Sequence, residues 1–327
     1  MEHRRIGQLS ASVVGMGCNQ LGTACDQALT AQIVGEALDA GVNYFDTADE
    51  YGRDYSDPND VDGWGLSEEY LGRALKHHRD EAVIASKFGI PPPGDSSGGG
   101  GGAQWIGIAV EASLRRLGTD HLDLYQLHVP DPSVPIGETL DALNGLVRSG
   151  KVREIGCCNL SGVELEEAAT VAEQAGLAPF ASVQSPLNVI QRVTLDDVMP
   201  ACERLGLAFI PYYPLASGML TGKYRRGERP SAGTRLTDQL GEEAQARLFS
   251  DRTFDRLEAL EGYALARGHT LLELAFAWLL GFPRVSAVIA GAAKTGQVSA
   301  NAGASEWRLS ADEHGQVTRV VQHAVAS

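Results

Sequence analysis

Short apolar runs rich in β-branched residues alternate along this chain with longer segments whose apolar positions recur every three or four residues. The short runs predict eight buried strands, at Ser12–Gly17, Val42–Asp46, Ala82–Lys87, Leu122–His128, Val152–Cys157, Phe180–Gln184, Leu207–Tyr212 and Val285–Ala290. The longer segments predict helices at Thr30–Ala40, Ser67–His78, Gln104–Leu117, Ile136–Ser149, Ser161–Ala175, Leu195–Leu205, Arg252–Leu280 and Thr295–Ala302. This is the pattern of repeated strand and helix units.

Several helix boundaries carry their own sequence signals. Ser67, a residue type favoured at helix starts, is followed by Glu68 and Glu69, whose negative charge suits the first turn of a helix. At the other end, a glycine in the left-handed conformation often terminates a helix. Five predicted helices are followed by such a glycine, at Gly41, Gly118, Gly150, Gly176 and Gly206.

Strict alternation of eight strands with helices predicts an α/β fold, a single (β/α)8 TIM barrel with residues 1–327 as one domain. A doubly wound open sheet is the alternative that this alternation allows. In a barrel the active site lies at the C-terminal ends of the strands. The irregular stretches Arg53–Gly65 and Ile90–Ala103 follow strands, so we expect both at that face, and we expect mobility around the glycine run Gly98–Gly102.

Charge and composition narrow the classes of partner. The chain carries 27 basic and 42 acidic side chains, and a net charge of −15 disfavours binding to nucleic acid or to anionic membrane lipid. The five cysteines form no CxxC pair, so neither a disulfide framework nor a metal site is expected. With no apolar signal core and no long apolar span, we expect a soluble cytoplasmic protein. The oligomeric state stays open.

Titratable residues stand at successive predicted strand ends. Asp46 ends the second strand, Lys87 the third and His128 the fourth, where barrel strands usually carry branched apolar side chains. Tyr51 lies five residues beyond Asp46. Asp46, Lys87 and His128 each have an ordinary structural explanation, as a turn cap, a solvated strand end and a satisfied core imidazole respectively. The four together at one face of a barrel indicate a catalytic site.

These four residue types suit the reduction of a carbonyl group by hydride. Hydride transfer leaves an alkoxide, which needs a proton donor within hydrogen-bond reach. Tyr51 is expected to be this general acid, and the base in the reverse direction, because a neighbouring Lys87 would lower its pKa. Asp46 would keep Lys87 protonated and oriented, and His128 would orient the substrate oxygen or relay its proton.

Four sequence blocks make this interpretation specific. They are NYFDTADEYG at Asn43–Gly52, VIASKFG at Val83–Gly89, LDLYQLHVPDP at Leu122–Pro132 and GKVREIGCCNL at Gly150–Leu160. Their order and spacing resemble the aldo-keto reductase family, in the branch of potassium-channel β-subunits and aryl-alcohol dehydrogenases. The resemblance implies an NADP-dependent oxidoreductase acting on CH–OH or carbonyl groups, with a catalytic tetrad of Asp46, Tyr51, Lys87 and His128.

The resemblance also implies where a nicotinamide cofactor binds. The carboxamide-binding positions of the family map to Cys158, Asn159 and Gln184, and Cys158 stands where serine is usual. The segment Ile210–Tyr224 resembles the block whose tyrosine, here Tyr212, stacks on the nicotinamide ring; Tyr213 is a second replacement of a usual serine. Its pyrophosphate neighbours map to Leu215, Ser217, Gly218 and Lys223.

The segment Ile289–Gly303 is similar to the adenosine-phosphate block of the family. The matching positions are Gly291, Lys294, Gln297 and Asn301. A helix N-terminus there would offer amide donors to a phosphate, and Lys294 would add a charge suited to a 2′-phosphate. NADP(H) is therefore expected in preference to NAD(H).

Substrate specificity is less determined. Trp64, on the loop that leaves Tyr51, is predicted to reach over the substrate, and packing beneath the loop is the alternative. The expected substrate is a small aldehyde, ketone, sugar or alcohol, in either reaction direction. A different hypothesis is an NADP(H)-binding regulatory subunit that senses redox state and turns over slowly.

Overall fold

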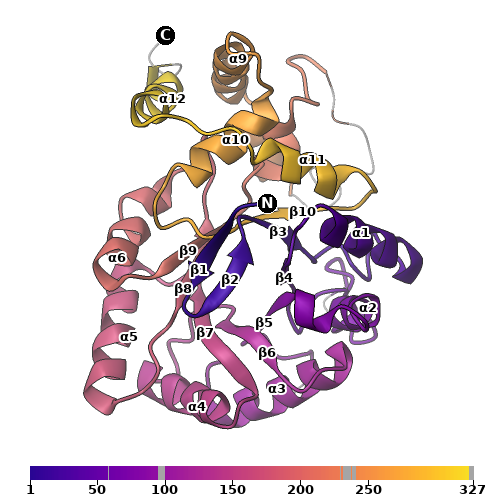
Figure 1. Cartoon of the computed structure of the whole chain (residues 1–327), viewed down its shortest axis with the longest axis vertical. Helices are drawn as coiled ribbons and strands as arrows, with labels where there is room; N and C mark the ends of the chain where they lie inside the picture. Colours follow the sequence, from indigo (N-terminus) through magenta and orange to yellow (C-terminus); the bar gives the residue numbers. More distant parts are fainter. Residues whose placement is uncertain (58, 95–99, 229, 231–236, 238–240, 324–327) are drawn as a thin grey trace.

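Eight parallel strands form a closed barrel in the computed structural model, with helices around its outside (Figure 1). The structure describes residues 1–57, 59–94, 100–228, 230, 237 and 241–323. Neighbouring strands follow the order β10-β3-β4-β5-β6-β7-β8-β9. The barrel closes between β9 and the segment before β10, where the Phe209 amide donates to the Arg284 carbonyl (2.7 Å) and the Ser286 amide donates to the Phe209 carbonyl (3.0 Å). The predicted TIM barrel is thereby confirmed, and the open sheet is excluded.

All eight predicted strands are present near their predicted positions. The barrel strands are β3 (Val14–Gly17), β4 (Tyr44–Asp46), β5 (Val83–Phe88), β6 (Leu122–Leu127), β7 (Val152–Cys158), β8 (Ser182–Pro186), β9 (Ala208–Tyr212) and β10 (Val288–Gly291). The helices between them are α1 (Gln27–Asp39), α2 (Leu66–Ala74), α3 (Ala103–Leu117), α4 (Ile136–Arg148), α5 (Gly162–Ala175), α6 (Val198–Leu205) and α11 (Gln297–Ala304). Short 3-10 turns are η1 (Arg79–Glu81), η2 (Val193–Leu195) and η3 (Ala216–Thr221).

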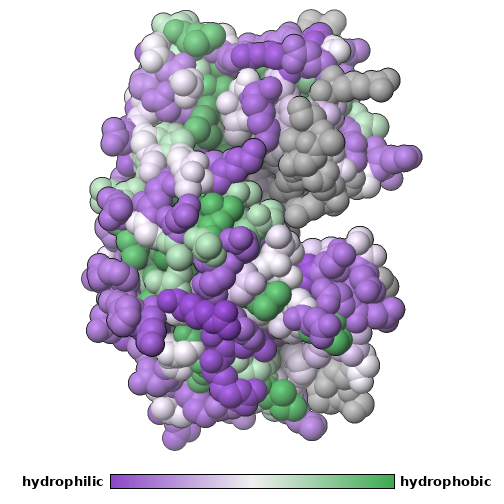
Figure 2. Space-filling view, turned by 90° about the vertical axis from the view of Figure 1, so that its right-hand side faces the viewer, coloured by the Kyte–Doolittle hydropathy of each residue, from purple (hydrophilic) through white to green (hydrophobic). Residues whose placement is uncertain are grey.

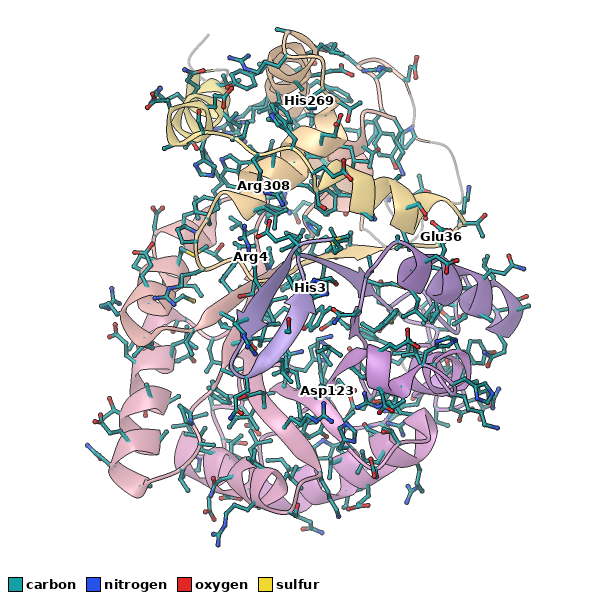
Figure 3. The ribbon with its side chains drawn as sticks, in the orientation of Figure 1. His3, Arg4, Glu36, Asp123, His269 and Arg308 are labelled. Carbon is teal, nitrogen blue, oxygen red and sulfur yellow. The ribbon has the colours of Figure 1, made fainter. Side chains whose placement is uncertain are left out.

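The first residues of the chain form a hairpin that was not predicted. It closes the end of the barrel at which the strands begin. Strands β1 (His3–Ile6) and β2 (Leu9–Ser12) pair antiparallel, and their apolar side chains Ile6 and Leu9 are buried against the first inward residues of the barrel strands. Arg4 donates to the carbonyls of Val285 and Leu280 at 2.7 and 3.0 Å, which ties the hairpin to the last part of the barrel (Figure 3). The opposite end stays open.

One segment that was predicted as a single helical stretch forms two helices in the structure. The segment Arg252–Leu280 forms α9 (Asp251–Leu265) and α10 (Leu271–Leu280). Thr270 starts α10 with a capping box, in which its hydroxyl accepts from the Glu273 amide while the Glu273 carboxylate accepts from the Thr270 amide. The local capping signal therefore outweighs the continuous helical periodicity. Helices α8 (Glu242–Leu248) and α12 (Ala311–His323) were not predicted.

The helix start expected at Ser67 is also corrected. Helix α2 begins at Leu66, and Gly65 precedes it with a φ of 81° and no side-chain cap. Ser67 is buried inside the first turn, where its hydroxyl donates to the Cys18 carbonyl at 2.8 Å. The Ser67 hydroxyl is therefore used in a tertiary hydrogen bond and does not cap the helix. The five predicted terminating glycines all have the left-handed φ, between 64 and 77°.

The two irregular loops leave the carboxyl ends of β4 and β5, as predicted. Figure 2 shows a notch in the surface on the side that lies at the back of the view in Figure 1, whereas the hairpin lies at the front of that view. Gly98 and Gly99 of the glycine run lie outside the described residues. Gly101 is held at both polar groups, since its amide donates to Asp131 (2.8 Å) and its carbonyl accepts from Thr139 (2.8 Å).

Candidate active site

Asp46 and Lys87 project into the barrel because of strand periodicity. Tyr44 and Ala85 contribute to the apolar cluster inside the amino end of the barrel. Side chains two residues apart in a strand point the same way, so Asp46 and Lys87 follow them on the inner face, one layer nearer the open end. Both are almost fully buried, at 3% and 0% exposure.

Lys87 lies at the centre of a compact polar cluster. Its Nζ donates to Asp46 Oδ1 at 2.6 Å, to the Thr47 carbonyl at 2.8 Å and to the Tyr51 hydroxyl at 3.3 Å. The His128 ring meets the Tyr51 ring edge to face, with 5.7 Å between centroids. The structure thus places the four residues of the predicted tetrad side by side.

The second oxygen of Asp46 is held by two glutamines. Oδ2 accepts from Gln184 Nε2 at 2.8 Å and from Gln126 Nε2 at 3.3 Å. Gln126 was not among the predicted site residues, although it is a polar side chain near the carboxyl end of β6 and stands in register with Lys87. Gln184, assigned by resemblance to the nicotinamide, also fixes the orientation of Asp46.

The electrostatics keep Lys87 charged and Tyr51 protonated. Burial by itself lowers the pKa of Lys87, but the Asp46 carboxylate, together with Tyr51 and Cys158, outweighs this effect, so the pKa of the ammonium lies above its usual range. Burial raises the pKa of Tyr51, and the Lys87 charge only partly opposes this. At neutral pH Tyr51 is therefore a neutral phenol with a stabilising cation beside it, which is the state that a proton donor requires.

His128 is a neutral imidazole in this environment. Burial, and then the charge of Lys87, lower the pKa of His128 to about 3. Its Nδ1 is buried without a hydrogen-bond partner among the described residues, and Glu50 Oε1 lies 3.8 Å from it. Glu50 was not a predicted site residue. Glu50 gave no sequence signal, because its place at the site depends on His128, which directly follows β6.

The residues assigned to the nicotinamide end also meet. Asn159 follows β7, and its Nδ2 donates to the His128 carbonyl at 3.1 Å while its Oδ1 accepts from the Tyr212 hydroxyl at 2.9 Å. Cys158 stands in register with Gln184 on the neighbouring strand. Burial raises the pKa of the Cys158 thiol to about 12, so this side chain is an uncharged thiol rather than a reactive thiolate.

Backbone strain is concentrated where the cofactor is expected. Among the described residues, the non-glycine positions with positive φ are Asn159, Tyr213, Ala216 and Ser217, at 47 to 63°. All four lie in the segments predicted to bind the nicotinamide or the pyrophosphate. Such conformations cost free energy and accumulate at ligand-binding loops. The main chain at these segments therefore fits a site shaped for a bound cofactor.

The residues predicted to be pyrophosphate neighbours lie in and directly after one turn that follows β9. Leu215 packs against the main apolar core, and Ser217 and Gly218 interrupt η3 with left-handed φ values of 56 and 93°. Lys223 reaches back over this turn, because a Cβ added to Gly218 would meet its Nζ at 2.8 Å. The glycine thus allows the lysine to approach the turn closely.

The adenosine end differs from what the sequence indicated. The amides of Ala293 and Lys294 donate to the Gln297 side chain at 2.7 and 3.1 Å, and those of Gly296 and Ser299 donate to the Glu36 carboxylate at 2.7 and 2.8 Å. Glu36 comes from α1, which lies beside α11 (Figure 3). The amides assigned to a phosphate thus already have partners within the chain.

The other residues assigned to this block are Gly291, Lys294 and Asn301, and their role at a cofactor stays a prediction. The Lys294 side chain is exposed to solvent, and Gly291 ends β10 beside Gly17 of β3. Asn301 is 6% exposed on α11. Lys294 thus remains able to meet a phosphate that approaches from solvent.

Trp64 packs on an arginine of its own loop. The Arg53 guanidinium lies 5.2 Å from the Trp64 ring centre and 4.6 Å from that of Tyr55. Trp64 is half-buried, in a loop that begins next to Tyr51. A contact with substrate stays a prediction.

No group of three or more His, Cys, Asp or Glu side chains in the described ranges is arranged to hold a metal ion. Within the same ranges, no helix has the length and apolarity needed to cross a membrane.

The comparisons with known proteins agree with the fold. The profile of the Aldo/keto reductase family matches residues 13–322, and the chain belongs to this family. It is 29% identical to aldo-keto reductase YhdN of Bacillus subtilis (strain 168), over 100% of this chain and 95% of that protein. It is 31% identical to a probable voltage-gated potassium channel subunit beta of Oryza sativa subsp. japonica, over 91% of this chain and 87% of that one.

A solved structure is similar over the whole chain. The glycerol dehydrogenase AKR11B4 from Gluconobacter oxydans superposes with a TM-score of 0.84 at 28% identity, and the match covers 100% of this chain and 97% of that one. Together these relatives define an oxidoreductase of the aldo-keto reductase class.

Proposed function

We propose that this protein is an NADPH-dependent aldo-keto reductase that interconverts a small carbonyl compound and its alcohol. The observation that carries the proposal is the buried Lys87 ammonium, which is held by Asp46 at 2.6 Å and donates to the Tyr51 hydroxyl at 3.3 Å. A barrel interior tolerates such a charge only when it is paired. Because the Lys87 ammonium lies beside the Tyr51 phenol, it stabilises the phenolate that forms when Tyr51 gives up its proton.

The reaction divides between the cofactor and the chain. The bound nicotinamide supplies or accepts the hydride. In reduction Tyr51 donates its proton to the substrate oxygen, and Lys87 stabilises the phenolate that remains. Asp46 keeps Lys87 charged and oriented, and His128 holds the substrate oxygen beside Tyr51. In oxidation the same phenolate takes the proton back.

A preference for NADP(H) is supported by Lys294 and by the family. Lys294 is exposed at the start of α11, where its ammonium can reach a 2′-phosphate. Glu36 opposes this preference, because it places a carboxylate at the same helix start. We assign the preference to Lys294 and expect it to be moderate.

The decisive test replaces only the Tyr51 hydroxyl. Tyr51→Phe is expected to lower turnover roughly 100- to 10,000-fold, the usual contribution of a positioned acid or base, while NADPH binding measured by fluorescence titration is unchanged. Tyr263→Phe is the matched control, because that hydroxyl lies away from the site and donates to Gln316 on the surface (3.2 Å). Weakened binding with retained turnover in Tyr51→Phe would contradict the proposal.

A regulatory role is the second candidate, and similarity to the probable potassium channel subunit supports it. A subunit that senses the ratio of oxidised to reduced cofactor would bind NADPH but turn over slowly. Absorbance of the reduced nicotinamide, followed across a panel of aldehydes, ketones and sugars, separates the two. Fast oxidation of NADPH by any panel member would rule out a purely regulatory protein.

A further inference from the structure

Three arginines outside the proposed active site have no acidic partner. Arg192 lies on the loop after β8, and Arg252 and Arg256 lie one turn apart on the same side of α9. In the ranges that the structure describes, no carboxylate is within ion-pair distance of any of the three. In a chain with 42 acidic and 27 basic side chains, three unpaired cations need an explanation.

The three side chains converge where the loop, α9 and α12 meet. Arg256 Nη1 donates to the carbonyl of Ile190, two residues before Arg192, at 3.4 Å. Arg192 Nη1 donates to the carbonyl of Thr318 on α12 at 3.0 Å, and α9 and α12 pack side by side (Figure 1). Burial, and then the charges of Arg252 and Arg192, lower the pKa of Arg256, so the like charges repel one another. We call Arg192, Arg252 and Arg256 the arginine cluster.

The arginine cluster is also short of hydrogen-bond acceptors. Arg256 Nε is buried and has no partner in the described part of the chain. The two bonds to carbonyls use one nitrogen of Arg192 and one of Arg256, whereas each guanidinium carries five N–H groups. Asp196 partly opposes the effect of burial on the pKa of Arg192, but it does not form an ion pair with this arginine. An acceptor from outside the chain would therefore relieve both the missing hydrogen bonds and the repulsion.

The carboxylates of α9 are engaged by a different arginine. Arg226 pairs with Asp251, Asp255 and Glu258 at 3.0, 2.6 and 2.9 Å. One arginine thus has three acidic partners, while the arginine cluster has none among the described residues. This distribution leaves the arginine cluster as a positive site on an acidic protein, and its local field attracts anions.

We propose that the arginine cluster is a binding site for the phosphate group of a small molecule. A guanidinium presents its N–H groups in a planar fork that matches two oxygens of a phosphate. A phosphate carries up to two negative charges at neutral pH, so it offsets more of the repulsion than a carboxylate does, and its oxygens can accept from Arg256 Nε. The site is separate from Lys294, to which we assign the 2′-phosphate of the cofactor.

The loop that carries Arg192 connects the arginine cluster with the open face of the barrel. It begins at the carboxyl end of β8, where the Leu187 amide donates to the Tyr212 carbonyl at 3.2 Å. Asn188 Nδ2 donates to the Tyr213 carbonyl at 3.0 Å. The phosphate group has two sources to distinguish: a phosphorylated carbonyl substrate that extends from the active site, and a phosphorylated effector that binds separately. Only the first rests on the proposed function.

The first test measures phosphate binding without cofactor or substrate. Inorganic phosphate is titrated by calorimetry, and thermal unfolding is compared in phosphate and in chloride at equal ionic strength. We expect saturable binding that raises the unfolding temperature, and a loss of affinity of roughly 10-fold or more in Arg252→Gln and in Arg256→Gln, as for the loss of a charge-assisted hydrogen bond. Arg204→Gln is the matched control, because it removes the same charge from an exposed ion pair with Glu166.

Arg252 keeps the test decisive if Arg256→Gln does not fold, because Arg252 is exposed. In chloride alone, Arg252→Gln should not lower the unfolding temperature, since the substitution removes a repelling charge and no ion pair. A lower unfolding temperature in chloride, with phosphate affinity unchanged, would make Arg252 a structural residue and refute the inference.

Two further results would overturn the proposal. One is a phosphate effect that is absent from the unmodified protein, or that is equally large in Arg252→Gln, Arg256→Gln and Arg204→Gln. The other is loss of the phosphate effect in Lys294→Ala, because the phosphate would then occupy the cofactor site.

Kinetics with NADPH assign the phosphate group to its source, with glyceraldehyde 3-phosphate and glyceraldehyde as the compared substrates. If the group belongs to the substrate, kcat/KM for the phosphorylated aldehyde falls roughly 10-fold in Arg252→Gln, while that for glyceraldehyde does not change. If it belongs to a separate effector, inorganic phosphate binds equally with and without either aldehyde. A protein that binds phosphate but oxidises NADPH with no carbonyl compound would count against the proposed function alone.

Discussion

The buried pair of Asp46 and Lys87 makes a prediction about stability that needs no substrate. Their charged atoms are 2.6 Å apart, and the side chains are 4% and 0% exposed. At an effective dielectric constant of about 20, unit charges at that separation attract by roughly 6 kcal/mol, and desolvation cancels much of this. Removing either partner leaves the other charge buried and unpaired. Asp46→Asn and Lys87→Met are each expected to cost about 3–5 kcal/mol.

The double variant distinguishes this reasoning from simple loss of contacts. With both substitutions no uncompensated charge remains, so Asp46→Asn/Lys87→Met should cost about as much as one single substitution rather than the sum. Free energies of unfolding from urea titration, in the absence of cofactor, give the coupling energy, which we expect to be about 3 kcal/mol or more. The reasoning would be refuted if the destabilisation of the double variant equalled the sum of the two single destabilisations to within roughly 0.5 kcal/mol.

An exposed pair of the same chemistry provides the control. Lys151 and Glu111 form an ion pair between α3 and the start of β7, with 41% and 48% of their side chains exposed. Solvent screens such a pair, so the same double-mutant cycle with Lys151→Met and Glu111→Gln should give less than about 1 kcal/mol.

Three further predictions follow from single side chains. Burial, and then the Glu68 carboxylate, raise the pKa of Asp49 well above its usual range, so the stability that the protein has at acid pH is lost as the pH rises above the pKa of the unfolded state. Asp49→Asn should therefore stabilise the protein at neutral pH by more than roughly 0.5 kcal/mol and make the urea midpoint less dependent on pH. A loss of stability in this variant would refute the prediction. Lys294→Ala should weaken NADPH binding roughly tenfold in fluorescence titration and leave NADH binding unchanged, whereas an equal loss for both cofactors would show that Lys294 does not read the 2′-phosphate. Gly52 has a φ of 108°, and an added Cβ would lie 2.7 Å from Leu66 Cβ. Gly52→Ala should therefore lower the free energy of unfolding by about 1–3 kcal/mol, measured by thermal unfolding. Gly145→Ala is the control: its helical position has open space around it, so this substitution should not destabilise the protein.

The cofactor end of the site shows how a local motif can mislead. The start of α11 contains Lys294 and has no acidic residue of its own, which favoured a free phosphate site. The carboxylate that reaches these amides is Glu36, 260 positions away from Gly296. The proposed preference for NADPH over NADH would therefore depend on two helices, α1 and α11, that are neighbours only in the folded barrel.

The sequence predicted the barrel because strands buried on both faces must be continuous apolar runs, and because alternation with helices allows few topologies. It failed where local signals compete: Thr270 restarts a helix inside a continuous helical pattern, and Ser67 gives its hydroxyl to a distant carbonyl instead of a helix end. The hairpin β1–β2 escaped prediction because its strands are short and mostly polar.

The same division applies to the site. Asp46, Lys87 and His128 were readable from the sequence, because parallel strands bring their carboxyl ends to one face and polar residues there are conspicuous. Glu50 and Gln126 join the site only in the folded chain, where segments remote in sequence place His128 3.8 Å from Glu50 and Asp46 within hydrogen-bond distance of Gln126. Strand periodicity determines which residues face the mouth of the barrel; tertiary packing decides which atoms are within hydrogen-bond distance, and therefore where each proton lies.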